Sequence, residues 1–216
     1  MDIKELKQKV CEVIDENRDR IIGIGEEIFS NPELGYKEYK ATELIAREFQ
    51  KLGLNPEKNI AVTGVRARVN ETKNGPTIAV LGELDSVICV EHGAADPKTG
   101  AVHACGHHIQ AASLMGAAIG LVASNAIGEL DGELDFMAVP AEEFVELEFR
   151  GKLRDEGKIS YFGGKQELIK RGYFDDVDMS IMMHALNMPK EKKVIVGAVG
   201  NGFIGKNVNF IGKEAH

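Results

Sequence analysis

Three imidazoles and one thiol fall within six consecutive residues, the HACGHH segment at positions 103–108. Within it, Cys105 and His107 stand two residues apart. A thiolate and a neutral imidazole at this spacing can bind one metal ion from a single turn if Gly106 lets the backbone bend tightly, and the ion would hold the cysteine deprotonated. Taken alone, the segment fits equally well a buried cysteine beside exposed histidines at the start of a helix.

Further candidate ligands stand at the ends of two predicted strands. Glu142 and Glu143 directly follow an apolar run at 136–140, and His184 closes the apolar run 178–184. A site for zinc or a similar divalent ion needs additional nitrogen, oxygen or sulfur donors of this kind. One glutamate is expected to ligate, while its neighbour accepts a proton from metal-activated water.

Each of these residues also has an ordinary structural explanation. Adjacent glutamates are usually surface charge, but an unpaired carboxylate at the rim of a buried strand is costly, and a metal would remove that cost. An isolated histidine such as His184 is more often a core residue, although its position at a strand end favours ligation. Asp85, which follows the apolar run 77–84, is either a cap or the acceptor that orients a ligand imidazole.

A thiol nucleophile built on Cys105 is a third possible chemistry. It is the weaker hypothesis, because a Cys–His nucleophile does not require the strand-end acids or His184. The spacing of Cys89 and His92, in the loop before the HACGHH segment, demands no role, and Cys11 is expected in the core.

The spacing of apolar residues predicts the elements that position these candidates. Predicted helices cover residues 3–29, 40–52, 107–124 and 165–171, and predicted strands cover residues 64–69, 77–84, 132–139 and 178–184. This alternation predicts an α/β fold with a mostly parallel sheet flanked by helices. Ligands of such sheets collect outside the carboxyl ends of the strands, where the candidate residues stand.

Composition limits the classes of partner. The 216 residues have a formal net charge of −8 and contain no Lys/Arg run, which argues against nucleic acid or an anionic membrane surface as a partner. No apolar stretch reaches the roughly 20 residues of a membrane span, and the charged N-terminus lacks the features of a secretory signal. The three cysteines are few and odd in number, which argues against a disulfide framework, so a reducing, cytoplasmic location is expected.

Four motifs in the order GELDS, HACGHH, PAEE and MMHA resemble the zinc-dependent aminoacylase and glutamate-carboxypeptidase family. The similarity is greatest to its amidohydrolase branch, which includes hippurate hydrolases, auxin-conjugate hydrolases and aminobenzoyl-glutamate hydrolase subunits. The resemblance covers nearly the whole chain, from the helical lead into NPELGYKE to the closing GKEAH.

This resemblance implies a two-domain subunit with a two-metal site, holding zinc or alternatively manganese or cobalt, and a small inserted α+β domain used for dimerisation. Residues 1–199 would be the N-terminal part of the catalytic domain. Residues 200–216 would be the first strand of the inserted domain, so that the chain stops before the site is complete. A homodimer or higher homo-oligomer is expected at full length.

The resemblance also implies roles for individual residues. The metal ligands would be Cys105, His107, Glu143 and His184. Glu142 would be the general base, Asp85 a supporting carboxylate, and His216, which matches a GKxAH motif, would hold the substrate or its oxyanion. Many relatives read HACGHD, whereas here His108 stands beside the ligands in place of the acid. The family's last metal-binding histidine lies downstream of this sequence.

The function expected from the sequence is metal-dependent hydrolysis of the amide bond in N-acyl amino acids or small peptides. The alternative is an incomplete, non-catalytic fragment that binds metal or a partner without turnover.

Overall fold

A computed structural model of the protein describes residues 2–71, 74–186, 194–197, 202, 208 and 210–215. The chain divides into two units, Met1–Ala185 and Leu186–His216. All helices and strands given below belong to the first unit. Of the predicted strand at 200–216, the structure describes residues 202, 208 and 210–215, none of which belongs to a strand, and His216 lies outside the described residues. In the parts of the chain that are described, no helix is long and apolar enough to cross a membrane.

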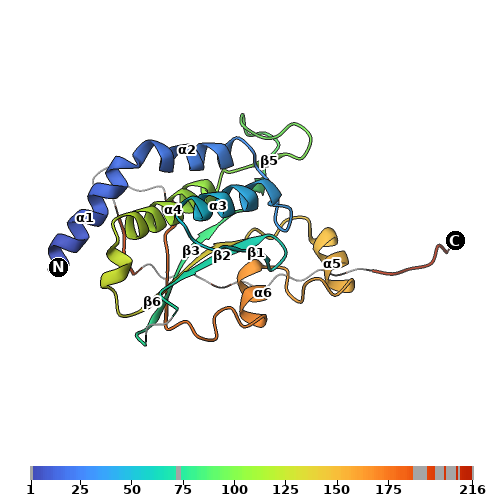
Figure 1. Ribbon diagram of the computed structural model, residues 1–216. Coiled ribbons are helices and arrows are strands. Elements are labelled where there is room, and N and C mark those ends of the chain that lie inside the picture. The colour runs from blue at the N-terminus through green and yellow to red at the C-terminus, as the bar shows by residue number, and fades with distance from the viewer. Residues whose placement is uncertain are drawn as a thin grey trace. The chain divides into compact units, whose positions relative to one another are not determined.

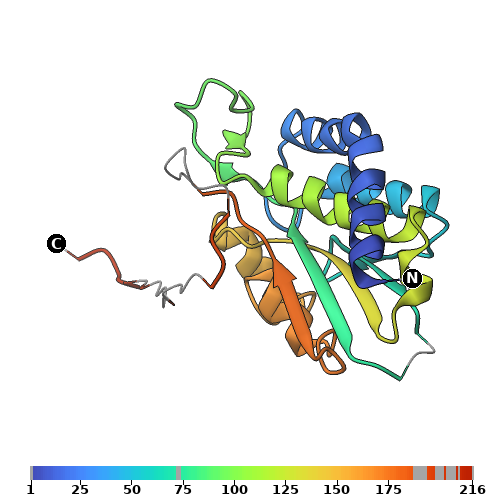
Figure 2. The ribbon, with the colours of Figure 1, turned by 90° about the vertical axis from the view of Figure 1, so that its left-hand side faces the viewer.

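A five-stranded sheet forms the centre of the first unit. In spatial order its strands are β1 (Glu57–Ile60), β2 (Gly64–Val69), β6 (Glu133–Val139), β3 (Thr77–Glu83) and β7 (Met179–Met182). Only β2 runs against the other strands, because β1 and β6 both pair with it in antiparallel fashion, whereas β6, β3 and β7 pair in parallel. Figure 2 shows β7 beside β3 at the edge of the sheet. The predicted α/β class with a mostly parallel sheet is confirmed.

Helices cover both faces of this sheet (Figure 1). On one face lie α3 (Tyr39–Lys51) and α4 (His107–Ala123), and α1 (Ile3–Glu16) and α2 (Arg18–Phe29) pack on α4. The other face carries α6 (Gly164–Lys170). The remaining elements are the helix α5 (Leu147–Asp155), the 3₁₀ turn η1 (Ala126–Glu129) and a small hairpin of β4 (Val87–Ile88) and β5 (Ala101–Val102).

The side chains of β6 explain why both faces are covered. Phe136 and Ala138 belong to the core beneath α3 and α4, whereas Met137 and Val139 belong to a second core that includes Leu168 of α6. Successive side chains of a strand point to opposite faces, so an apolar run without alternation is buried on both sides. The strand therefore carries the chain through the middle of the molecule to the acidic pair that follows it.

The structure differs from the predicted elements at several places, and β1, β4, β5 and η1 are elements for which no prediction was made. The predicted helix at 3–29 is two helices that meet at Asn17, where the backbone leaves helical geometry (φ −98°, ψ 14°). The side-chain amide of Asn17 donates a hydrogen bond to the carbonyl oxygen of Val13 (2.8 Å), which also accepts from the backbone N–H of Asn17 (3.1 Å). The polar segment at 144–164, for which no element was predicted until residue 165, contains α5. Cys11, expected in the core, is exposed, and all three cysteines are unpaired.

Candidate metal centre

Three parallel strands end at the same edge of the sheet and bring the candidate residues to it. Glu83, the last residue of β3, is in register with Val139, the last residue of β6. On the other side of β3, Leu81 is in register with Met182 of β7. His184 follows two residues later, at the level of Glu83. The acidic pair after β6 and the histidine after β7 thus flank the end of β3.

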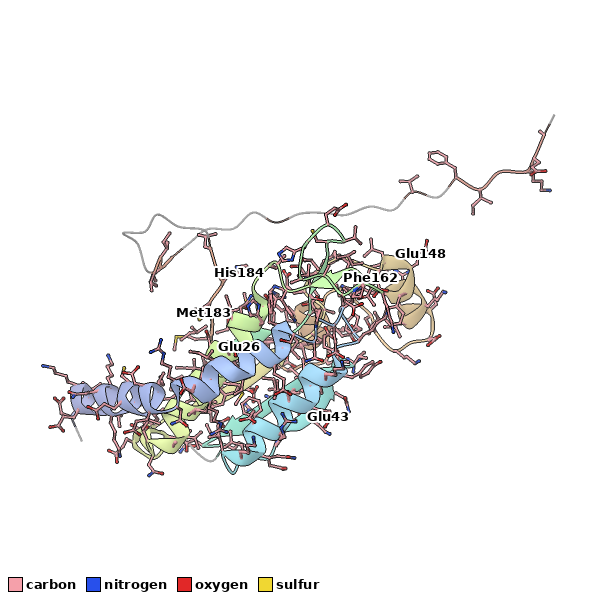
Figure 3. All side chains as sticks on the ribbon, turned by 90° about the horizontal axis from the view of Figure 1, so that it is seen from above. Glu26, Glu43, Glu148, Phe162, Met183 and His184 are labelled. Carbon is pink, nitrogen blue, oxygen red and sulfur yellow. The ribbon has the colours of Figure 1, made fainter. Side chains whose placement is uncertain are left out.

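The HACGHH segment reaches this edge through a tight turn into α4. Gly106 has a φ of 97°, a left-handed conformation that glycine adopts without strain. A Cβ at Gly106 would lie 3.0 Å from the Cβ of Ala185, the residue after His184. The turn thereby brings Cys105 against His184, whose Nε2 lies 3.4 Å from the thiol Sγ. Figure 3 marks His184, just beyond the end of β7.

Two overlapping groups of possible ligand atoms centre on His107. Cys105, His107 and His184 each offer one atom within 4.8 Å of the others, and so do Glu83, His107 and Glu142. The ring of His107 is buried and stands edge-on to the ring of His184, with 6.0 Å between the ring centroids. Four residues that were predicted to take part in the chemistry therefore lie together, although they come from three segments of the chain: Cys105, His107, Glu142 and His184.

Both predicted glutamates face the same imidazole nitrogen. The Nε2 atom of His107 lies 3.9 Å from Oε2 of Glu142 and 3.8 Å from Oε1 of Glu143. Burial and the neighbouring carboxylate of Glu83 raise the pKa of Glu142 above its ordinary value. A carboxyl group with a raised pKa at this position suits proton transfer.

Asp85 orients the ring of His107. The Nδ1 atom of His107 lies 2.9 Å from the backbone oxygen of Asp85 and 3.2 Å from its Oδ1. The other carboxylate oxygen of Asp85 accepts a hydrogen bond from the backbone N–H of Glu143 (2.9 Å). This arrangement leaves Nε2 of His107 turned toward the cluster, as expected for a ligand imidazole whose second nitrogen is held by a carboxylate.

Sequence reasoning missed Glu83, which completes the surroundings of His107. Its Oε2 lies 3.0 Å from Nε2 of His107, although outside hydrogen-bonding geometry, and accepts a hydrogen bond from Gln110 (2.7 Å). Its Oε1 pairs with the ammonium group of Lys165, which also lies 3.8 Å from Oε1 of Glu142. Glu83 stands two residues before Asp85, and the side-chain period of a strand could have signalled that both point to one face.

Burial and neighbouring charges shift the pKa values of three groups in the cluster. Burial alone would lower the pKa of His107, but Asp85 and Glu83 raise it to about 10. Burial and the carboxylates of Glu143 and Glu142 raise the pKa of the Cys105 thiol to about 12. Burial would raise the pKa of Glu83, but His107 and Lys165 lower it to about 2.

The donor set fits a divalent cation. The Nε2 atom of His107 is buried and has no hydrogen-bond partner among the described residues. The cluster otherwise consists of a thiol, a second imidazole and carboxylates, with the ammonium of Lys165 beside them. An ion bound at His107 and Cys105 would replace the two protons that these groups hold and offset the excess of negative charge.

One of the predicted residues, His108, lies apart from these contacts. The ring of His108 packs on Phe29, with 4.9 Å between the centroids, and on His103, with 5.5 Å. His103 is buried, and neither of its ring nitrogens has a hydrogen-bond partner among the described residues. His216, predicted to help hold the substrate, is outside the described residues.

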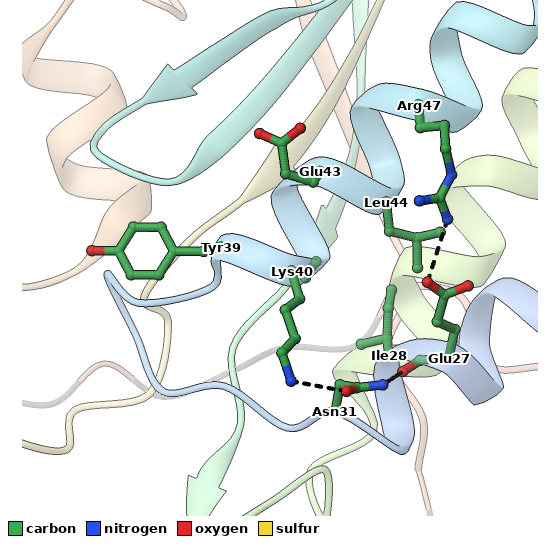
Figure 4. A pocket seen from close by; sticks show the side chains of 9 residues that line it. Glu27, Ile28, Asn31, Tyr39, Lys40, Glu43, Leu44 and Arg47 are labelled. Atoms are coloured by element: carbon green, nitrogen blue, oxygen red, sulfur yellow. Dashed lines mark hydrogen bonds and ion pairs between the residues drawn. The ribbon is translucent and has the colours of Figure 1, made fainter.

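A separate surface groove of about 430 Å³ lies between α2 and α3 (Figure 4). Polar contacts cross it, between Arg47 and Glu27 (3.3 Å) and between Lys40 and Asn31 (3.0 Å). None of the candidate ligands lines it.

Comparison with known proteins supports the family indicated by the four motifs. No family model matches the chain. The chain is 32% identical over 184 residues to thermostable carboxypeptidase 2 of Saccharolobus solfataricus, which covers 83% of this chain and 42% of that protein. It is 30% identical over 172 residues to IAA-amino acid hydrolase ILR1-like 4 of Arabidopsis thaliana, covering 78% of this chain and 34% of that protein. The chain thus spans less than half the length of these relatives.

Solved structures agree on the fold. The YXEP protein of Bacillus subtilis, described as a dinuclear metal-binding peptidase of the M20 family, superposes with a TM-score of 0.60 at 24% identity, over 77% of this chain and 42% of that one. The relatives in sequence match the family that the motifs resemble. This chain belongs to the family of amidohydrolases and carboxypeptidases.

Proposed function

We propose that this chain is part of an enzyme that uses divalent metal ions to hydrolyse the amide bond of N-acyl amino acids or small peptides. The convergence of Cys105, His107 and His184 within 4.8 Å, beside the paired glutamates, carries this proposal. The names of the relatives support it, since a carboxypeptidase and an amino-acid conjugate hydrolase both cleave amide bonds.

The proposed roles are those that the motif resemblance implies, and the clustering of these side chains around His107 supports them. Cys105, His107, Glu143 and His184 bind the metal ions, and Asp85 fixes the ring of His107 through Nδ1. Glu142 takes the proton from the attacking water and delivers it to the leaving amine. When bound, the metal supplies a Lewis acid that polarises the carbonyl and lowers the pKa of water. The raised pKa of Glu142 favours its holding the proton between the two steps.

The number and identity of the metal ions, the division into domains and the oligomeric state are also proposals. Two ions are proposed, because a structurally similar protein is described as dinuclear, and zinc suits a site that combines thiolate, imidazole and carboxylate. Residues 1–199 are proposed as catalytic domain and 200–216 as the start of an inserted domain, where His216 would bind substrate. A cytoplasmic, homo-oligomeric enzyme is proposed for the whole protein.

The test replaces Glu142 with Gln in the full chain. Metal content, measured by elemental analysis, is expected to stay at the wild-type level, while hydrolysis of a panel of N-acyl amino acids and dipeptides falls by roughly 10²- to 10⁴-fold. A Glu142→Gln protein that retains wild-type turnover would contradict the role of Glu142. A wild-type protein that binds metal but hydrolyses none of the panel would support the non-catalytic alternative.

Sensitivity to a chelator distinguishes this chemistry from a thiol nucleophile. Complete removal of metal is expected to abolish turnover, and its restoration to recover it. Activity that survives metal removal but is lost on alkylation of Cys105 would identify the thiol as the nucleophile instead.

A further inference from the structure

The loop that carries the two glutamates leaves the sheet in an unusual backbone conformation. β6 ends at Val139, and Ala141 then adopts a positive φ of 52° although it is not glycine. A non-glycine residue in this region is strained and persists only when its surroundings hold it there. Ala141 is fully buried, so the restraining groups must come from the protein interior.

Glu38 supplies one restraint. Its side chain is fully buried directly before α3, and its Oε1 accepts a hydrogen bond from the backbone N–H of Ala141 (2.7 Å). Its Oε2 accepts a hydrogen bond from the hydroxyl of Thr63. Because both carboxylate oxygens are engaged, the side chain cannot turn without leaving a buried polar group unpaired, which is costly.

Arg150, on α5, supplies a second restraint, at the other end of the acidic pair. It is the largest fully buried side chain among the described residues. Its Nη2 donates to the backbone oxygen of Glu143, and its Nη1 donates to the backbone oxygens of Phe162 (2.7 Å) and, more distantly, Ala141 (3.5 Å). Its guanidinium also stands over the ring of Tyr36, 5.5 Å from the centroid. The planar fork thereby ties the loop to two other segments.

The guanidinium of Arg150 is closely packed against Gly35. A Cβ at Gly35 would overlap Nη2 of Arg150 and would lie 2.9 Å from Cα of Ala141. Buried ionic groups contribute little net stability compared with apolar side chains of similar volume. What Arg150 supplies here is a defined position for the backbone on both sides of Glu142.

We propose that Glu38 and Arg150 are positioning residues of the metal centre, and that their hydrogen bonds to residues 141–143 set where the carboxylates of Glu142 and Glu143 lie. Asp85 acts on the same loop through the N–H of Glu143 but also contacts His107, whereas the side-chain hydrogen bonds of Glu38 and Arg150 are to the loop and its supports. This inference rests on the proposed function in one respect, namely that Glu142 is the base and Glu143 a metal ligand.

Zinc affinity tests the part played by Arg150. The metal-stripped full chain is titrated calorimetrically with Zn²⁺ at a temperature where circular dichroism shows each variant folded. Replacing Arg150 with Met is expected to raise the Kd about 10- to 100-fold, because Glu143 loses its fixed position. Arg150→Lys is expected not to restore affinity, since an ammonium cannot reproduce the fork. Arg154→Met, an exposed change on the same helix, should bind as wild type.

A second variant covers the case in which Arg150→Met does not fold. Gly35→Ala keeps every charged group but crowds the guanidinium, and it is expected to weaken Zn²⁺ binding about 10-fold or more. Wild-type affinity in whichever of the two proteins folds would overturn the role of Arg150, because a merely structural residue would lower the melting temperature without changing Kd in the folded protein.

Kinetics test the part played by Glu38. Glu38→Met removes the acceptor of the Ala141 N–H and is expected to lower kcat about 10- to 100-fold with little change in KM. Glu38→Gln keeps an acceptor oxygen and should recover most of the loss, and Glu43→Gln, exposed on α3, should resemble wild type. Equal kcat values for Glu38→Met and Glu43→Gln would overturn this role. If the wild type binds zinc without turnover, the proposed function fails, while the zinc affinities still decide the positioning inference.

Discussion

The Nε2 atom of His107 lies 3.0 Å from Oε2 of Glu83, and both side chains are buried. In the metal-free protein this nitrogen carries a proton, because Asp85 and Glu83 together raise the pKa of His107 to about 10 despite its burial. A metal ion at His107 would occupy the same nitrogen. Protonation and metal binding therefore compete at one atom, and the first predictions follow from this competition.

Metal binding is expected to release about two protons near neutral pH, one from His107 and one from Cys105. The pKa values of these groups, about 10 and about 12, lie above neutrality, so both are protonated before the ion binds. Affinity for Zn²⁺ should therefore rise steeply with pH between about pH 6 and pH 8. Calorimetric titrations in buffers with different ionisation enthalpies measure the number of protons released. An affinity independent of pH would contradict this electrostatic account.

Glu83→Gln is expected to lower the stability of the metal-free protein by about 2 kcal/mol, because the charged acceptor of Lys165 and Gln110 is lost. The pKa of Glu83 falls from its ordinary 4.5 to about 2, so its contribution is complete above pH 4.5 and is lost as pH falls through about 2. The pKa of His107 rises from 6.5 to about 10, so its contribution is complete below pH 6.5 and is lost as pH rises through about 10.

The difference in unfolding free energy between wild type and Glu83→Gln should therefore be largest between pH 4.5 and pH 6.5. Urea denaturation across this range measures it. Glu91→Gln, an exposed change, provides the control. A difference that grows as the pH is lowered toward 2 would show that the sign of the Glu83 contribution is wrong.

His108→Asp is expected to raise the pKa of His103. Burial, and then the neighbouring His108 and His107, lower the pKa of His103 to about 3. A carboxylate at position 108 would replace a repulsive neighbour with an attractive one for the imidazolium form. NMR titration of the His103 ring measures the change, with His108→Asn as the neutral control. Equal pKa values in the Asp and Asn variants would rule out the electrostatic explanation.

Much of the fold could be predicted from the sequence, because its elements carry strong apolar patterns. The predicted strand at 64–69 matches β2, and the predicted helix at 107–124 matches α4 to within one residue. Residues 136–139 of the predicted strand 132–139 are apolar on both faces, and the strand lies in the middle of the sheet, as such runs do. α5 was missed because its buried face centres on Arg150, a residue type that is normally exposed.

The sequence predicted which residues could be ligands of the candidate centre, but not the contacts that hold them in place. Cys105, His107 and the strand-end residues could be expected together, because parallel strands place their carboxyl ends at one edge. The contacts of Glu38 and Arg150 could not be foreseen, since they join segments more than 100 residues apart or act on backbone atoms, which leave no pattern in the sequence. The same holds for Lys165, whose partner Glu83 lies on another element.

The most direct test of the metal centre compares two cysteines of the same chain. Metal-stripped wild-type protein, Cys105→Ser and Cys89→Ser are titrated with Zn²⁺ under identical conditions. Cys105 lies beside His184 at the centre, whereas Cys89 lies outside both groups of possible ligands. We predict that Cys89→Ser binds as the wild type does and that Cys105→Ser loses most of the affinity and releases one proton fewer. Equal Zn²⁺ affinity in the two serine variants would contradict the assignment of the centre.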